Sequence, residues 1–154
     1  MLFFLRTLVA AVAVLPFASA FIDNAAPYSG TYKATAHSKF PVTFTAGHAP
    51  GATYHDLIVY FGLATPNEIA ASQNKSMGTP LPNATIDLVA HDADYLGHDR
   101  TFWVPLHSAA FPKKSGNYVL VAVVLTDNVN IYTPVPVNIP ELRTFYISFK
   151  AVKE

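Results

Sequence analysis

The segment "NYVLVAVVLT", residues 117–126, decides the fold class, because an extended chain of this sequence is apolar on both of its faces. The segment "YHDLIVYFGLA", residues 54–64, has the same character. Strands that are apolar on both faces are typical of the middle of a sheet that is covered on both sides. We therefore expect these two segments to be central strands of a β domain.

Other segments alternate between apolar and polar residues. In "FPVTFTA", residues 40–46, every second residue is Phe or Val, and "RTFYISFKAV", residues 143–152, alternates in the same way. Period-two alternation predicts half-buried strands. Weaker strands are expected at residues 32–36, 86–90 and 101–106. About seven strands, separated by Pro, Gly, Asn and Asp turns, predict an all-β fold, an immunoglobulin-like antiparallel β-sandwich.

One segment, "TPNEIAASQN", residues 65–74, predicts a helix instead. Thr65 can cap a helix, Pro66 suits the first helical turn, and Glu68 lies three residues after the cap. We expect one short helix inserted between strands.

The first twenty residues have the features of a secretory signal peptide. Arg6 precedes an apolar run at residues 8–17, and Ala18-Ser19-Ala20 supplies the small residues of a cleavage site. Cleavage after Ala20 leaves residues 21–154 as a single β-sandwich domain of an exported protein. No later segment approaches the ~18 apolar residues of a membrane span, so none is expected.

Composition limits the means of stabilisation and the partners. The chain has no cysteine, and 51% of its residues are hydrophobic, so its apolar core must hold the domain together without disulfides. Ten Lys and Arg residues balance ten Asp and Glu residues, and no basic run occurs. We therefore expect neither nucleic acid nor anionic lipid as the partner.

Two sequons, Asn74-Lys75-Ser76 and Asn83-Ala84-Thr85, are candidate sites of N-glycosylation in an exported protein. They flank Pro80 and Pro82, which indicates that residues 66–85 form a surface excursion.

The segment "HDADYLGHDR", residues 91–100, is the main candidate for a metal site. It imitates the start of a calcium loop, but Leu96 and Trp103 stand where oxygen ligands belong. His91, His98 and an aspartate are an alternative zinc set, although their spacing matches no standard site. We interpret the segment as a polar loop and expect no bound metal or cofactor.

Enzyme signatures are weak. The chain offers no thiol nucleophile and no Gly-x-Ser-x-Gly elbow, and residues 21–154 contain only three glutamates for a carboxylate pair. We expect a protein without catalytic residues.

Two apolar features suggest binding surfaces. Trp103, in "TFWVPL", is interpreted as a core or half-buried strand residue, and a sugar-stacking platform is the alternative. The second feature is "NVNIYTPVPVNIP", residues 128–140, which is uncharged and rich in proline. If buried, it covers one end of the sandwich. If exposed, it forms a partner-binding ridge of Ile131, Tyr132, Val135 and Ile139.

Three segments, taken in order, resemble one family. They are "IVYFGLATP" at residues 58–66, "MGTPLPNATIDL" at 77–88 and "SGNYVLVAVVLTDNVN" at 115–130. A strand that ends in Phe-Gly-x-Ala, a Gly-Thr segment and a Gly-x-Tyr-Val-Leu strand are similar to those of the fungal necrosis-inducing secreted protein (NIS-type) effectors. The resemblance extends over roughly residues 40–152.

The resemblance implies a small secreted β protein that suppresses plant immune signalling. Its partners would be host receptor-like kinases and associated cytoplasmic kinases, and it could also induce cell death. The protein would act in the apoplast or after transfer into the host cell, since a domain without disulfides tolerates both compartments. The resemblance assigns no kinase-contacting residue. The alternative function is an extracellular carbohydrate- or cell-wall-binding module built on Trp103.

Overall fold

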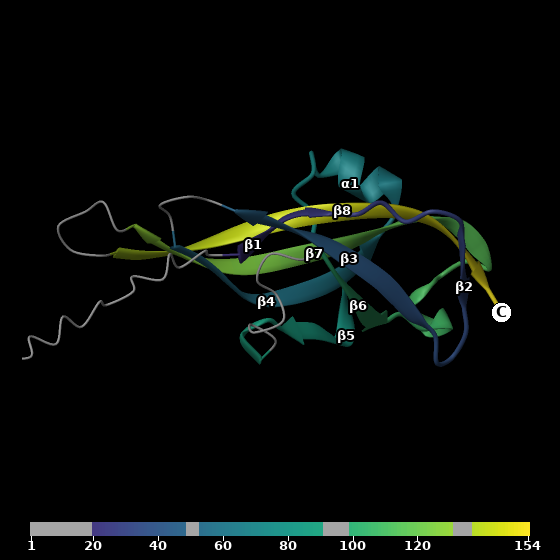
Figure 1. The fold of residues 1–154 in the computed structure, drawn as a ribbon. Helices are drawn as coiled ribbons and strands as arrows, with labels where there is room; N and C mark the ends of the chain where they lie inside the picture. The colour runs from purple at the N-terminus through teal and green to yellow at the C-terminus, as the bar shows by residue number, and fades with distance from the viewer. Residues whose placement is uncertain (1–19, 49–52, 91–98, 131–136) are drawn as a thin grey trace, which may run out of the picture.

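The computed structural model describes residues 20–48, 53–90, 99–130 and 137–154. Its strands form two sheets that pack face to face (Figure 1), so the expected all-β sandwich with one short helix is confirmed. Sheet A has the strand order β1-β3-β6, and sheet B has the order β2-β8-β7-β4-β5. The elements are β1 (Ala20–Ala25), β2 (Thr31–Ala34), β3 (Lys39–His48), β4 (Thr53–Ala64), α1 (Pro66–Ala71), β5 (Thr79–Asp87), β6 (Arg100–Pro105), the 3₁₀ turn η2 (Ser108–Ala110), β7 (Ser115–Asn130) and β8 (Val137–Lys153).

Strands β4 and β7 are central, as the sequence predicts. β7 pairs with β4 on one side and with β8 on the other. The inward residues of β7 join the core between the sheets. Its outward valines, Val119, Val121 and Val123, are buried beneath Ile69 of α1. Both faces of the middle of β7 are therefore covered, which explains why residues 118–125 are apolar without interruption.

The capping signals of α1 are confirmed. The Thr65 hydroxyl accepts a hydrogen bond from the Glu68 backbone N–H, and the Glu68 carboxylate accepts one from the Thr65 backbone N–H. The Thr65 hydroxyl also donates a hydrogen bond to the Glu68 carboxylate. The bond from the Thr65 backbone N–H, and to a lesser extent the bond from its hydroxyl, lowers the pKa of Glu68, because both favour the charged carboxylate. Among the described residues, no helix is long and apolar enough to cross a membrane.

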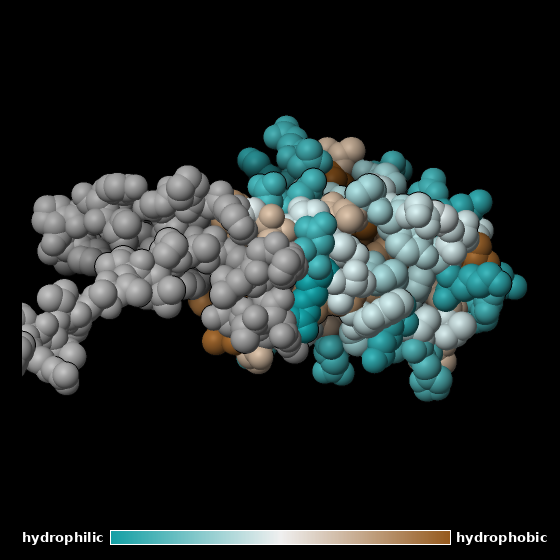
Figure 2. All heavy atoms as spheres, viewed as in Figure 1, coloured by the Kyte–Doolittle hydropathy of each residue, from teal (hydrophilic) through white to brown (hydrophobic). Residues whose placement is uncertain are grey.

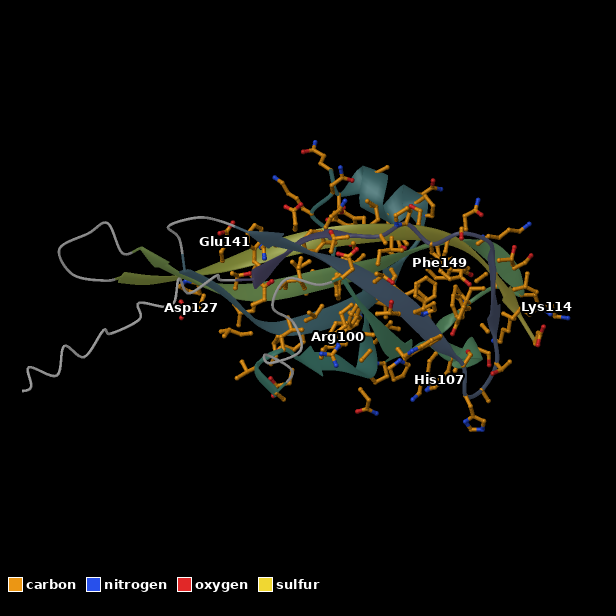
Figure 3. The ribbon with its side chains drawn as sticks, in the orientation of Figure 1. Arg100, His107, Lys114, Asp127, Glu141 and Phe149 are labelled. Carbon is orange, nitrogen blue, oxygen red and sulfur yellow. The ribbon has the colours of Figure 1, made fainter. Side chains whose placement is uncertain are left out.

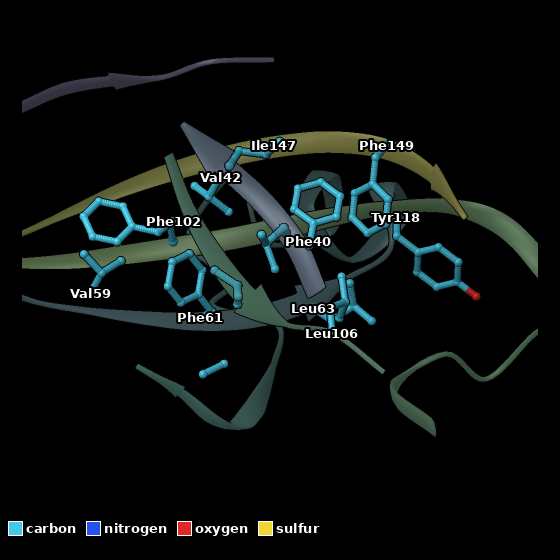
Figure 4. Packing of buried hydrophobic residues seen from close by; sticks show 14 of the residues in the cluster. Phe40, Val42, Val59, Phe61, Leu63, Phe102, Leu106, Tyr118, Ile147 and Phe149 are labelled. Atoms are coloured by element: carbon cyan, nitrogen blue, oxygen red, sulfur yellow. The ribbon is translucent and has the colours of Figure 1, made fainter. Parts of the chain in front are cut away.

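Aromatic rings fill the core near one end of the sandwich. Phe40 of β3 and Phe149 of β8 point toward each other across the two sheets (Figure 4), with ring centroids 4.7 Å apart. Tyr32 and Tyr118 contact the same Phe149 ring. Tilted and edge-to-face contacts of this kind add to the stability that apolar burial provides.

Three features of the topology differ from the expectation. Strand β1 has no counterpart in the predicted set, which brings the described strands to eight. β2 pairs with β8 in parallel, whereas the other strand pairs are antiparallel. The strand expected at 86–90 begins earlier, as β5, so part of the predicted excursion at 66–85 is an edge strand. Pro80 and Pro82 are tolerated in β5 because that edge needs no further ladder partners.

Two glycines allow β4 to pass close to the segment that leads into β5. A Cβ on Gly62 would overlap the carbonyl oxygen of Met77. Gly78 has a φ of +68°, and a Cβ there would press on the Leu63 carbonyl. Only glycine fits these close backbone approaches.

We expect Gly62→Ala to lower the free energy of unfolding by about 3 kcal/mol or more, because the overlap is with rigid backbone. Gly116→Ala is the matched control. Its Cβ would meet the Tyr118 ring at 3.3 Å, a contact that a small ring movement relieves, so we expect a loss of about 1 kcal/mol. Guanidinium denaturation measures both, and equal losses would show that the close approach at Gly62 is not rigid.

Candidate functional site

Most of the predicted ridge falls between β7 and β8, outside the residues that the structure describes. Ile131, Tyr132 and Val135 are outside the described residues, so their role as a ridge stays a prediction. The backbone of Ile139 is described and pairs with Asn128, and the β7–β8 ladder continues to Asn130 and Val137. Figure 1 shows this part of the hairpin projecting beyond the strands of sheet A.

The described base of the hairpin carries an apolar row that is partly exposed. Ile58, Leu125 and Leu142 pair directly across β4, β7 and β8, and we call these three residues the outer row. They lie on the face of sheet B that α1 covers further along, and Leu142 is 64% exposed. Tyr60, 45% exposed, extends the row along β4. Exposed apolar residues gathered in this way are typical of protein-binding surfaces.

One acidic side chain borders the outer row. Asp127 of β7 lies two residues beyond Leu125 on the same face, at the base of the projecting hairpin (Figure 3). Glu141 of β8 pairs with the buried Thr126 and therefore faces the other side of sheet B.

The sequence analysis missed the row, because Leu142 precedes the alternating segment at 143–152. The alternation itself could have revealed the row. Leu142 is two residues before Thr144 and therefore points to the same, outward-facing side of the strand.

Trp103 does not pack in the core, so the interpretation of it as a core or half-buried residue is wrong. It is 64% exposed, whereas its neighbours Phe102 and Val104 are buried. It stands on the outer face of sheet A opposite Pro41, beside the hydrogen-bonded hydroxyls of Thr43 and Thr101, 2.7 Å apart. Within the described strands of sheet A it is the only exposed aromatic residue. The coloured atoms of the face drawn in Figure 2 are mostly pale or hydrophilic.

Both sequon asparagines are exposed. Asn74 follows α1, and Asn83 lies in β5, with φ values of 61° and 59°. Asparagine is one of the residues that adopt this left-handed conformation readily. Accessible side chains allow glycosylation at both positions, which stays a prediction.

The histidines of the proposed zinc set, His91 and His98, lie outside the described residues. In the part of the chain that is described, no group of three or more His, Cys, Asp or Glu side chains is placed to hold a metal ion.

A pocket of about 510 Å³ opens at the end of the sandwich opposite the projecting hairpin. All three segments that carry the family resemblance line it. Leu63 to Thr65 come from the first segment, Thr79 to Pro82 from the second, and Tyr118 from the third. The β6–β7 connection supplies the remaining wall, including His107 and Pro112. The three motifs therefore build one feature of the molecule, although they lie far apart in the sequence.

The pocket wall contains one unsatisfied polar group. The Tyr118 hydroxyl is buried and has no hydrogen-bond partner among the described residues. Leaving such a group unpaired costs about 1–3 kcal/mol. Glu68 lines the pocket with a carboxylate that already caps α1. A mostly apolar pocket with few polar groups is typical of a binding site.

A buried polar network joins β1 to sheet B. The Asp56 carboxylate accepts hydrogen bonds from the Ile22 backbone N–H, from the Thr126 hydroxyl at 2.6 Å and from the Arg143 guanidinium at 2.7 Å. The guanidinium also lies 5.0 Å from the centre of the Phe21 ring. Because these groups satisfy one another, we assign the network a structural role.

In the comparisons with known proteins, no protein-family model matches this chain, and no curated protein matches its sequence.

We expect Arg143→Met to lower the free energy of unfolding by about 3 kcal/mol, because it leaves the Asp56 carboxylate buried without its counter-charge. In the double variant with Asp56→Asn, the loss should be smaller than the sum of the single losses. Lys33→Met is the control, since the Lys33–Glu154 pair, 3.2 Å apart, is well exposed and should contribute at most about 1 kcal/mol. Urea denaturation gives the four values, and additive losses would contradict the coupling.

Proposed function

We propose that the protein is a secreted effector that suppresses plant immune signalling by binding host receptor-like kinases and associated cytoplasmic kinases. It acts by occupying its partner and not by catalysis. The family resemblance suggests the class of partner. The partly exposed outer row supports binding to a protein, because apolar side chains in register across three strands form a surface that a partner can cover.

The proposed contact surface consists of the outer row and the hairpin that continues from it. Leu142 is the most exposed residue of the outer row. Asp127, on the same face as the outer row, favours a partner with a basic residue beside an apolar centre. The secreted protein would meet its target in the apoplast or inside the host cell, where the cysteine-free domain keeps its fold.

The direct test titrates recombinant 21–154 against the kinase domain of a plant immune co-receptor and follows autophosphorylation. We expect saturable binding and dose-dependent inhibition. Leu142→Asp should weaken binding roughly tenfold or more, because it replaces the most exposed apolar side chain of the row by a charge.

Val89→Asp is the matched control for this test. Val89 is also an exposed apolar residue, 61% accessible, but it lies after β5 and outside the outer row. Its variant should bind and inhibit like the wild type. The proposal fails if the wild type neither binds nor inhibits. If the two variants lose affinity equally, the outer row is not the contact surface.

A second function is favoured by the exposure of Trp103, namely binding to a cell-wall polysaccharide. An accessible indole ring beside the paired Thr43 and Thr101 hydroxyls can stack on a sugar ring and hydrogen-bond to its hydroxyls.

A pull-down with insoluble wall polysaccharides tests this alternative. If it is right, Trp103→Ala abolishes retention, and Tyr60→Ala, which removes an exposed aromatic ring from the other sheet, leaves retention unchanged. Equal retention of Trp103→Ala and the wild type would exclude a site built on Trp103.

A further inference from the structure

We infer that the pocket beneath β5 binds an uncharged apolar molecule of one or two rings that carries an oxygen acceptor. The inference rests on the shape of the pocket and the chemistry of its walls. It does not depend on the proposed kinase binding, which uses the opposite end of the molecule.

The size and the walls of the pocket suit a small molecule. Its volume of about 510 Å³ falls in the range of roughly 300–1,000 Å³ that is usual for such sites. Leu63, Leu81 and Pro112 present apolar surface from three separate segments. The β4 and β5 walls of the pocket are neighbouring strands of one sheet, in which Leu63 pairs with Thr79.

The polar groups of the wall define the ligand further. Tyr118 brings a hydroxyl that is buried without a partner, and a ligand oxygen can accept the hydrogen bond that the protein does not supply. Glu68 remains negatively charged at neutral pH, since its pKa is lowered, and an anionic ligand would be repelled there. An uncharged ligand with an acceptor meets both conditions.

Figure 4 shows the Tyr118 ring at the edge of the aromatic core, with its hydroxyl directed away from Phe149 and Phe40. The ring lies over Gly116, whose missing side chain makes room for it. A ligand at this wall therefore meets the polar end of the tyrosine, and the core keeps the apolar part of the ring.

The experiment uses the fluorophore 6-propionyl-2-dimethylaminonaphthalene, an uncharged two-ring ketone whose emission reports the polarity around its carbonyl. Titrating recombinant 21–154 should give a saturable blue shift. Thr79→Trp fills the pocket from an exposed strand position and should abolish the shift. Thr144→Trp, at an exposed position of β8 that does not line the pocket, is the matched control and should bind like the wild type.

Further variants keep the test decisive. If Thr79→Trp fails to fold, as judged by circular dichroism, Ala109→Trp blocks the pocket from the η2 wall instead. Tyr118→Phe should weaken binding several-fold and move the bound emission further to the blue, because the carbonyl loses its donor. Absence of a saturable shift, or a shift that neither tryptophan variant reduces, would overturn the inference. If Tyr118→Phe binds the fluorophore with the same affinity and the same emission as the wild type, the ligand does not need an oxygen acceptor.

Discussion

The contact between the Phe40 ring of β3 and the Phe149 ring of β8 is the interaction on which the rest of the structure depends. It joins a strand of each sheet across the core, in a chain that has no cysteine to do so covalently. The other rings of the cluster pack around this pair and fix the distance between the sheets at that end. The position of the pocket follows from it, because Tyr118, part of the pocket wall, packs on Phe149.

Different chemistry holds the opposite end of the sandwich. There the Asp56 carboxylate connects β1 of sheet A to β7 and β8 of sheet B through buried hydrogen bonds and an ion pair. Such a network adds less net stability than apolar packing, but it disfavours alternative registers, because a slipped strand would leave the carboxylate buried and unpaired. β1 has few other contacts with sheet B, and this network fixes its position there.

The two candidate surfaces lie at opposite ends of the molecule. Figure 3 places Asp127, which borders the outer row, at the hairpin end, and His107 and Lys114 at the end that contains the pocket. A protein that contacts the outer row would therefore leave the pocket open. The rigid sandwich separates the two surfaces, so a change at one of them need not alter the other.

The sequence alone determined those elements that form because of residues close to one another in the chain. The alternation in 40–46 and 143–152, the doubly apolar strands and the Thr65–Glu68 capping box each depend on neighbouring residues, and each is present in the structure. Only tertiary structure decided what depends on distant residues. Sequence did not reveal that β2 lies parallel to β8, that Trp103 faces solvent, that Asp56 is shared by four strands, or that three separate motifs line one pocket. The physical reason is that pairing register and burial are set by which strand lies alongside, and no window of neighbouring residues contains that information.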